Sequence, residues 1–181
     1  MTAFSLHADV ANYTQFFVAD TSVFDLGILV PDSRPITNWH PPEITLATEE
    51  DNQGLKIPDI GHILPGSLVF SARAEELLRD YLLPYGQLFR FTCDGKTWFY
   101  YNPTLVIDNA LDIANSQTYG TETKVIIKAA FFKDRLPKVS AIFKVPETKA
   151  AVTYFNDVGE VNFKSIVEKN NLIGLRFNQC L

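Results

Sequence analysis

The dipeptide Asp94-Gly95 is the feature that most constrains how this chain can fold. It separates two segments rich in aromatic and other apolar residues, Gln87–Cys93 and Lys96–Tyr101. Asp-Gly favours a two-residue type I′ turn, which fixes the register of the strands on either side. That register gives three facing pairs: Cys93 with Lys96, Phe91 with Trp98, and Phe89 with Tyr100. The sequence therefore predicts an antiparallel hairpin with aromatic rings stacked along one face.

Two other segments have the signals of helices. In the first, Ser71 is the expected N-cap, and Pro84 and Gly86 end the helix. Its apolar residues fall on one stripe: Ala74, Leu77, Leu78, Tyr81 and Leu82. In the second, an acidic variant of the capping box at 157–160 opens a helix toward Lys169. We therefore predict an α+β fold, with a mixed, mainly antiparallel sheet and two main helices.

Further strands are expected where β-branched and aromatic residues cluster. In the first half of the chain, Tyr13–Val18 and Phe24–Val30 are expected as two strands or as one strand and a turn. Further strands there are expected at Ile44–Thr48 and Leu68–Phe70. In the second half they are Thr104–Asp108, Lys124–Ala130, Val139–Val145, Val152–Phe155 and Ile173–Phe177. A helical turn or short helix is expected at Asn109–Asn115, with Asp108 as its cap.

Length and composition indicate a single domain covering residues 1–181. A chain of 181 residues can bury a core without disulfides or a structural metal. With 46% hydrophobic and 20% charged residues, the composition excludes a disordered chain. Residues 1–56 are proline-rich and acidic, and we expect this N-terminal part to pack on a core formed by residues 57–181, with apolar side chains such as Trp39 and Ile44 making the contact.

The distribution of charge excludes some classes of partner. The net charge is −5, and residues 1–60 carry nine acids but only two bases, whereas residues 121–181 carry ten bases and six acids. Nucleic-acid affinity requires clustered Lys and Arg, and the bases here are dispersed, so no nucleic-acid partner is expected. No apolar run is long enough for a membrane span, and the N-terminus lacks a secretory signal. We expect a cytoplasmic protein with no membrane contact.

Few residues are candidates for chemistry. Cys93 and Cys180 belong to no ligand cluster, and the three histidines are far apart in the sequence, so no metal and no cofactor are expected. Cys93 with His62 is one way to form a nucleophile and its base, and Asp108 with Asp112 is one way to form a carboxylate pair. These residues support an alternative function, a small cytosolic enzyme acting on a nucleotide or acyl substrate.

The order of motifs from residue 56 onward resembles bacterial immunity proteins of the Imm11 type. The segments that carry the likeness are Lys56–Ile60, Ser71–Leu78, Tyr100–Asp112 and Gly174–Phe177. Such proteins are inhibitors encoded beside the polymorphic toxins of type VI secretion or contact-dependent inhibition systems. The matching residues suit a scaffold, since Ser71 caps a helix and Gly174 permits a close backbone approach. The resemblance therefore implies a binding protein that neutralises a cognate toxin and is not an enzyme.

This resemblance gives the acidic N-terminal part a role. A toxin with a basic cleft would be covered by acidic side chains, because complementary charge speeds association. The candidate toxin-binding residues are Asp32, Glu43, Glu49, Glu50 and Asp51, with Trp39 as an aromatic anchor. A third possibility is a phage-related or structural adaptor, which neighbouring virion genes would indicate.

Overall fold

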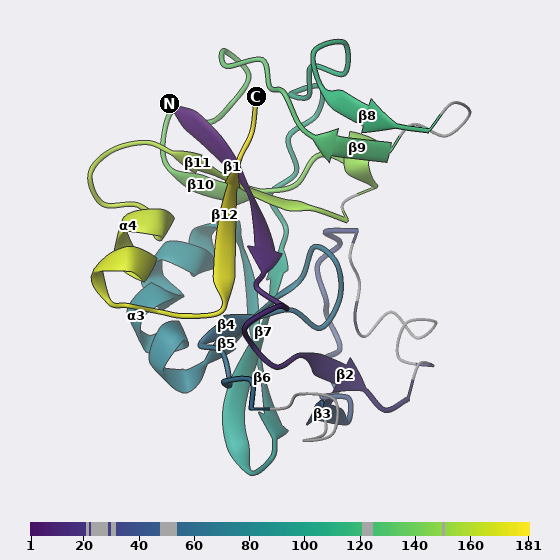
Figure 1. Cartoon of the computed structure of the whole chain (residues 1–181), viewed down its shortest axis with the longest axis vertical. Coiled ribbons are helices and arrows are strands. Elements are labelled where there is room, and N and C mark those ends of the chain that lie inside the picture. The colour runs from purple at the N-terminus through teal and green to yellow at the C-terminus, as the bar shows by residue number, and fades with distance from the viewer. Residues whose placement is uncertain (21, 23–28, 30–31, 48–53, 121–124, 150) are drawn as a thin grey trace.

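The computed structural model describes residues 1–20, 22, 29, 32–47, 54–120, 125–149 and 151–181. In these residues two four-stranded antiparallel sheets and two α-helices enclose a common core (Figure 1). Two smaller two-stranded ribbons complete the fold. The predicted α+β class, with two main helices and mainly antiparallel sheet, is confirmed for this part of the chain.

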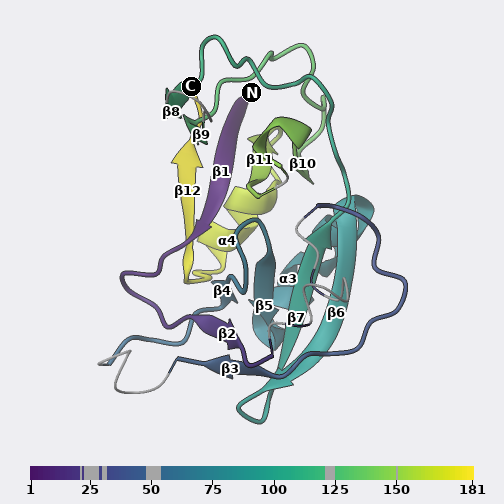
Figure 2. The same cartoon turned by 90° about the vertical axis from the view of Figure 1, so that its right-hand side faces the viewer.

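The first sheet joins the two ends of the chain. Its strand order is β10 (Ala141–Phe143), β11 (Thr153–Asp157), β1 (Thr2–Ala8) and β12 (Leu175–Gln179). Strand β1 is central, with Phe4 opposite Phe155 on one side and Gln179 on the other. The sequence pattern does not predict β1, yet it lies between two strands from the C-terminal third (Figure 2).

The second sheet contains the predicted hairpin. Its order is β4 (Ile60–Gly61), β5 (Leu68–Ser71), β7 (Lys96–Pro103) and β6 (Gly86–Cys93). All three predicted pairs of the hairpin are confirmed, and Asp94 and Gly95 both have positive φ, as a type I′ turn requires.

The helices lie together on one side of the molecule (Figure 1). Helix α3 is Ala72–Leu82, and the Ser71 side chain accepts a hydrogen bond from the Ala74 N–H, which confirms the predicted cap. Helix α4 is Phe163–Lys169, with a capping box formed by Asn162 and Ser165. Two short 3₁₀ turns occur at Leu83–Tyr85 and Pro146–Thr148.

The ribbons pair short strands. One consists of β2 (Phe16–Val18) and β3 (Ile44–Leu46), and the other of β8 (Gln117–Tyr119) and β9 (Val125–Lys128). The β2–β3 ribbon packs through Phe16 and Ile44 on the face of the second sheet that carries Phe91, Trp98 and Tyr100. This confirms that the hairpin carries its aromatic side chains on one buried face.

Several predicted elements differ from the structure. Thr104–Asp108 is no strand, since only Val106 forms a bridge, to Lys144. Residues 109–115 form turns and not a helix, so Asp108 caps no helix there. The second helix begins at Phe163 and not after Asp157, because Asp157 is the last residue of β11 and pairs with Thr2. Apart from the buried Leu29, the strand predicted at Phe24–Val30 lies outside the described residues.

Candidate functional site

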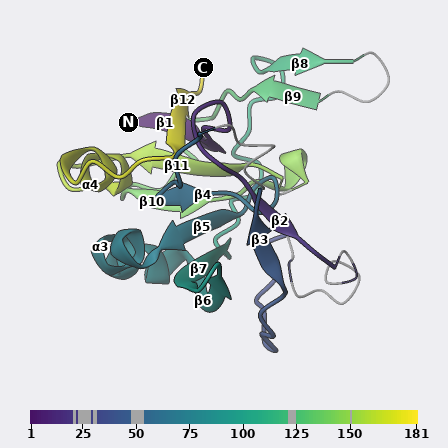
Figure 3. The ribbon, with the colours of Figure 1, turned by 60° about the horizontal axis from the view of Figure 1, so that its bottom comes forward.

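The β8–β9 ribbon has one apolar face that nothing in the described chain covers. Tyr119, Val125 and Ile127 are 74%, 58% and 60% exposed. Tyr119 lies opposite Val125 in the pairing, and Ile127 follows two residues later on the same side of β9. We call these three residues the outer face of the ribbon. The ribbon projects from the body on the side away from the helices (Figure 3).

The opposite face holds the ribbon to the body. Ile126, opposite Thr118, packs against a buried cluster that includes Leu111 and Ala129. Backbone hydrogen bonds join the chain before β8 to the chain after β9, from Asp112 N to Ala130 O at 2.8 Å and from Phe132 N to Ala110 O at 2.9 Å. The outer face is therefore presented on an anchored element.

Positive side chains follow the ribbon. Lys128 ends β9, and Lys133 and Lys138 lie in the connection to β10, all three exposed. In the same connection the Arg135 guanidinium lies over the Phe132 ring, 4.5 Å from its centroid. This end of the molecule thus combines exposed apolar side chains with cations.

The candidate toxin-binding residues have different surroundings. Asp32 is exposed and pairs with Arg34 at 2.6 Å. Its charge also acts on Lys144, where it offsets part of the lowering that burial causes, and the Lys144 pKa is about 8. Glu43 is exposed just before β3. Glu49, Glu50 and Asp51 lie outside the described residues.

Trp39 makes its contacts within the chain. Its ring stacks on Phe89 at 4.8 Å and on Tyr100 at 5.6 Å, and its Nε1–H donates to the Arg90 carbonyl at 3.0 Å. The ring thereby fastens the proline-rich segment to the hairpin face. The sequence analysis named Trp39 as an aromatic anchor for a partner. In the structure its ring contacts residues of the same chain, on the hairpin.

Replacing Trp39 by alanine should lower the free energy of unfolding by about 2–3 kcal/mol, less than the ~3–5 kcal/mol typical of a fully buried aromatic ring, because this ring is only half-buried. Trp39→Phe keeps the stacking but loses the hydrogen bond, and should cost about 1 kcal/mol. Urea denaturation of the two variants measures both values. An unchanged stability of Trp39→Ala would show that the ring is free to serve a partner.

Among the groups considered for catalysis, Cys93 is buried and Asp112 is hydrogen-bonded within a turn. Cys93 is 1% exposed, and burial raises the pKa of its thiol to about 11, so the thiol is protonated at neutral pH. The Asp112 carboxylate accepts hydrogen bonds from the backbone N–H and the side chain of Asn115, which stabilises the turn at the base of the ribbon. Asp108 is exposed in the preceding turn.

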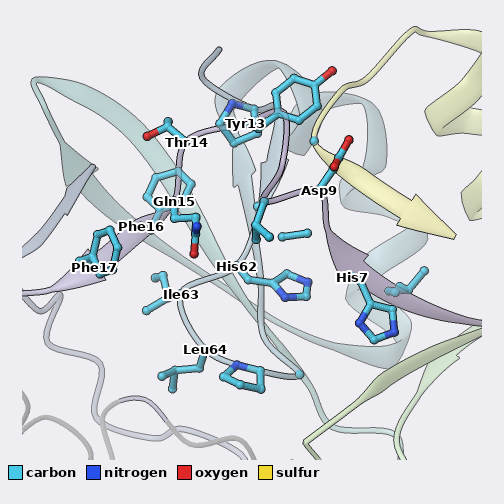
Figure 4. Close-up of a pocket in the computed structure, with 18 of the residues that line it drawn as sticks. His7, Asp9, Tyr13, Thr14, Gln15, Phe16, Phe17, His62, Ile63 and Leu64 are labelled. Atoms are coloured by element: carbon cyan, nitrogen blue, oxygen red, sulfur yellow. The ribbon is translucent and has the colours of Figure 1, made fainter. Parts of the chain in front are cut away.

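The structure brings together two histidines that the sequence separates. His7, at the end of β1, and His62, directly after β4, line one cavity of about 690 Å³ (Figure 4). Burial lowers the pKa of both imidazoles, that of His62 to about 4, and the neighbouring His7 contributes to the shift of His62. No spacing in the sequence indicates this pair, because it forms only when β1 and β4 are packed together.

Comparison with known proteins gives no assignment. A scan against protein-family models and a search of curated proteins returned no match for this chain. Within the described residues, no three His, Cys, Asp or Glu side chains gather as a metal site would require. No helix of those same ranges has the length and apolar character needed to cross a membrane. The function must be inferred from the surfaces and cavities of the protein itself.

Proposed function

We propose that this protein is an immunity protein that binds a cognate secreted antibacterial toxin and neutralises it stoichiometrically. The toxin would be delivered by type VI secretion or contact-dependent inhibition, and the complex would form in the cytoplasm of the producer or its siblings. The observation that carries the proposal is the outer face of the ribbon. The order of motifs that resembles Imm11-type immunity proteins supports the same function.

The outer face has the composition of a protein-binding surface. Interface cores are enriched in aromatic side chains, and Tyr is frequent among the residues that dominate binding energy. Tyr119 is the most exposed of the three residues, and Val125 and Ile127 lie beside it on the paired strand. A folded partner that covers these side chains would remove their apolar surface from water.

Charge indicates the chemistry of the partner surface. Lys128, Lys133 and Lys138 would meet acidic groups around an apolar patch on the toxin, which favours correct orientation and fast association. Glu43, with Glu49, Glu50 and Asp51, remains a proposed second contact, for a basic part of the same toxin. The single partner that we propose is therefore a folded toxin domain with an apolar, acid-rimmed surface.

Co-expression with the product of the adjacent open reading frame tests the function. We expect the chain to restore growth of cells that make this product, and to elute with it as a one-to-one complex. The absence of both rescue and complex would overturn the proposal. The mass of the chain alone should also be measured in solution. If the chain is a dimer that dissociates when residues of the outer face are substituted, that face serves self-association.

Substitution of Tyr119 and Ile127 by alanine tests the surface. Each hot-spot side chain contributes about 2 kcal/mol, so we expect the double variant to bind the toxin at least about 100-fold more weakly. The matched control is Val161→Ala, because Val161 is 79% exposed but lies between β11 and α4. Isothermal titration calorimetry measures the affinities. Equal affinity of the double variant and the control would remove the ribbon from the interface.

A further inference from the structure

Strand β12 is an outermost strand of the first sheet, and one of its two edges has no partner strand. Its only neighbour in the described parts of the chain is β1. The Cys180 N–H donates to the Ala3 carbonyl at 2.9 Å, which shows which set of residues bonds to β1. In an antiparallel pair, these residues alternate with residues whose N–H and C=O groups point outward. The outward-pointing residues of β12 are Leu175, Phe177 and Gln179.

This free edge is continuous and lacks the features that usually protect a sheet edge. No described turn or loop forms a backbone hydrogen bond with its three outward-pointing residues. The pairing with β1 runs without a bulge from Leu175 to Gln179, and the strand contains neither proline nor lysine. The edge ends at Leu181, whose N–H donates to the Ala129 carbonyl at 2.8 Å. Figure 2 shows β12 at the margin of the molecule, so its outer edge is open to a further strand.

The other outer strands of the two large sheets are contacted by other parts of the chain. Beside β10, residues 105–107 form two backbone hydrogen bonds with Lys144, which directly follows that strand. Beside β4, the Ile173 carbonyl accepts two backbone N–H groups. Beside β6, the indole N–H of Trp39 donates to the Arg90 carbonyl. Because exposed edges favour unwanted pairing, chains usually cover them, and β12 is the exception here within the described residues.

The two faces of the sheet differ beside this edge. On the helix side, the Phe177 ring contacts the Phe163 ring with centroids 5.9 Å apart. Lys164, which pairs with Glu168, also lies over the Phe177 ring. Arg176 lies on the opposite face, where it is exposed and forms no ion pair with any described residue. A strand added at this edge would therefore meet an apolar ring on one face and an unpaired cation on the other.

We propose that the free edge of β12 binds an extended, acidic segment of a partner protein as an additional antiparallel strand. Main-chain hydrogen bonds to Leu175, Phe177 and Gln179 provide affinity, and side chains of alternate residues provide specificity. An apolar residue of the segment lies beside Phe177, and an acidic residue pairs with Arg176. The antiparallel orientation continues the pairing of the sheet, whose strands are all antiparallel to their neighbours. This edge is separate from the outer face of the ribbon, and the proposal does not depend on the toxin.

Titration of the full chain with the capped peptide acetyl-Val-Glu-Val-Glu-Val-amide tests this binding. We expect NMR shifts of the β12 amides that saturate at millimolar peptide, and new protection of the Phe177 N–H from hydrogen exchange. The same peptide with glutamine in place of glutamate should bind about threefold more weakly, the effect of one exposed ion pair. The absence of saturation, or shifts confined to the β8–β9 ribbon, would overturn the proposal.

Methylation of single peptide nitrogens distinguishes strand pairing from other modes of binding. In the proposed register the central valine N–H donates to the Phe177 carbonyl, whereas the N–H of each glutamate points to solvent. Methylation at the central valine should weaken binding at least about tenfold, because it removes a hydrogen bond and adds a clash. Methylation at one glutamate should change the affinity by less than about threefold. Equal effects of the two methyl groups would overturn the proposal.

Gln179→Pro and Gln179→Ala form a matched pair on the protein side. Proline removes the outward N–H without removing a hydrogen bond to β1, whereas alanine keeps that N–H. We expect Gln179→Pro to bind the glutamate peptide at least about fivefold more weakly than Gln179→Ala. Arg176→Gln should abolish the preference for glutamate over glutamine. Equal affinities of the proline and alanine variants would overturn the proposal. So would a dimer of the original chain that Gln179→Pro dissociates in analytical ultracentrifugation, because the edge would then bind a second copy.

Discussion

Replacing Gly174 by alanine should lower the free energy of unfolding by about 3–5 kcal/mol, combining backbone strain with overpacking. An added Cβ would lie 2.3 Å from the Pro58 Cβ and 2.4 Å from the Ile60 carbonyl oxygen, and φ at this position is +101°. Neither neighbour can move easily, because the Asp59 and Ile60 N–H groups both donate to the Ile173 carbonyl. The substitution should therefore push the chain just before β12 away from Pro58 and from β4.

Gly159→Ala is the matched control for this prediction. Gly159 also has positive φ, +78°, but an added Cβ there has no neighbour within 4 Å. Its cost should be confined to backbone strain of about 1–2 kcal/mol. Chemical denaturation of both variants gives the difference. An equal loss in both variants would show that the close approach at Pro58 does not determine the stability of this region.

Stability should fall as the pH is lowered from 6.5 to 4, through the titration of His62. Its folded-state pKa of about 4 lies below the ordinary value of 6.5, so in this window the unfolded chain binds a proton that the folded chain does not. The stabilisation is fully present above pH 6.5 and is lost below pH 4. A shift of this size corresponds to about 3 kcal/mol.

His62→Phe separates this contribution from that of the acidic groups. The variant should lose about 3 kcal/mol less than the original chain between pH 6.5 and pH 4. Thr14→Val is the control, since it removes a buried hydroxyl from another residue that lines the cavity but no titratable group, and should keep the full pH dependence. Identical profiles for His62→Phe and the original chain would contradict the prediction. Urea unfolding at fixed pH values measures all three.

The secondary structure was predictable where its cause is local. The register of β6 and β7 follows from Asp94-Gly95, and the start of α3 follows from Ser71, because a turn and a cap involve residues within a few positions of each other. The predicted start of α4 was wrong because the residues from Asp157 onward fit a local capping pattern as well as the true cap at Asn162 does. Its pairing with Thr2, from the other end of the chain, extends β11 instead.

Exposure and function at particular residues were less predictable. Trp39 was expected both to pack on the core and to anchor a partner, and its ring does pack, on Tyr100 and Phe89 of a hairpin 50 or more residues later. The segment Lys124–Ala130 was expected to form a strand, and β9 lies within it. Nothing in its pattern of apolar residues shows that Ile126 faces the body while Val125 and Ile127 face solvent.

The sequence by itself determined the fold class, the hairpin and its aromatic face, and the first helix, because short-range turn chemistry, capping and apolar periodicity specify them. Only the tertiary structure decided that β1 lies between β11 and β12, that His7 and His62 share a cavity, and that one face of the β8–β9 ribbon is uncovered. These features depend on pairing and packing between distant segments, which local patterns do not encode.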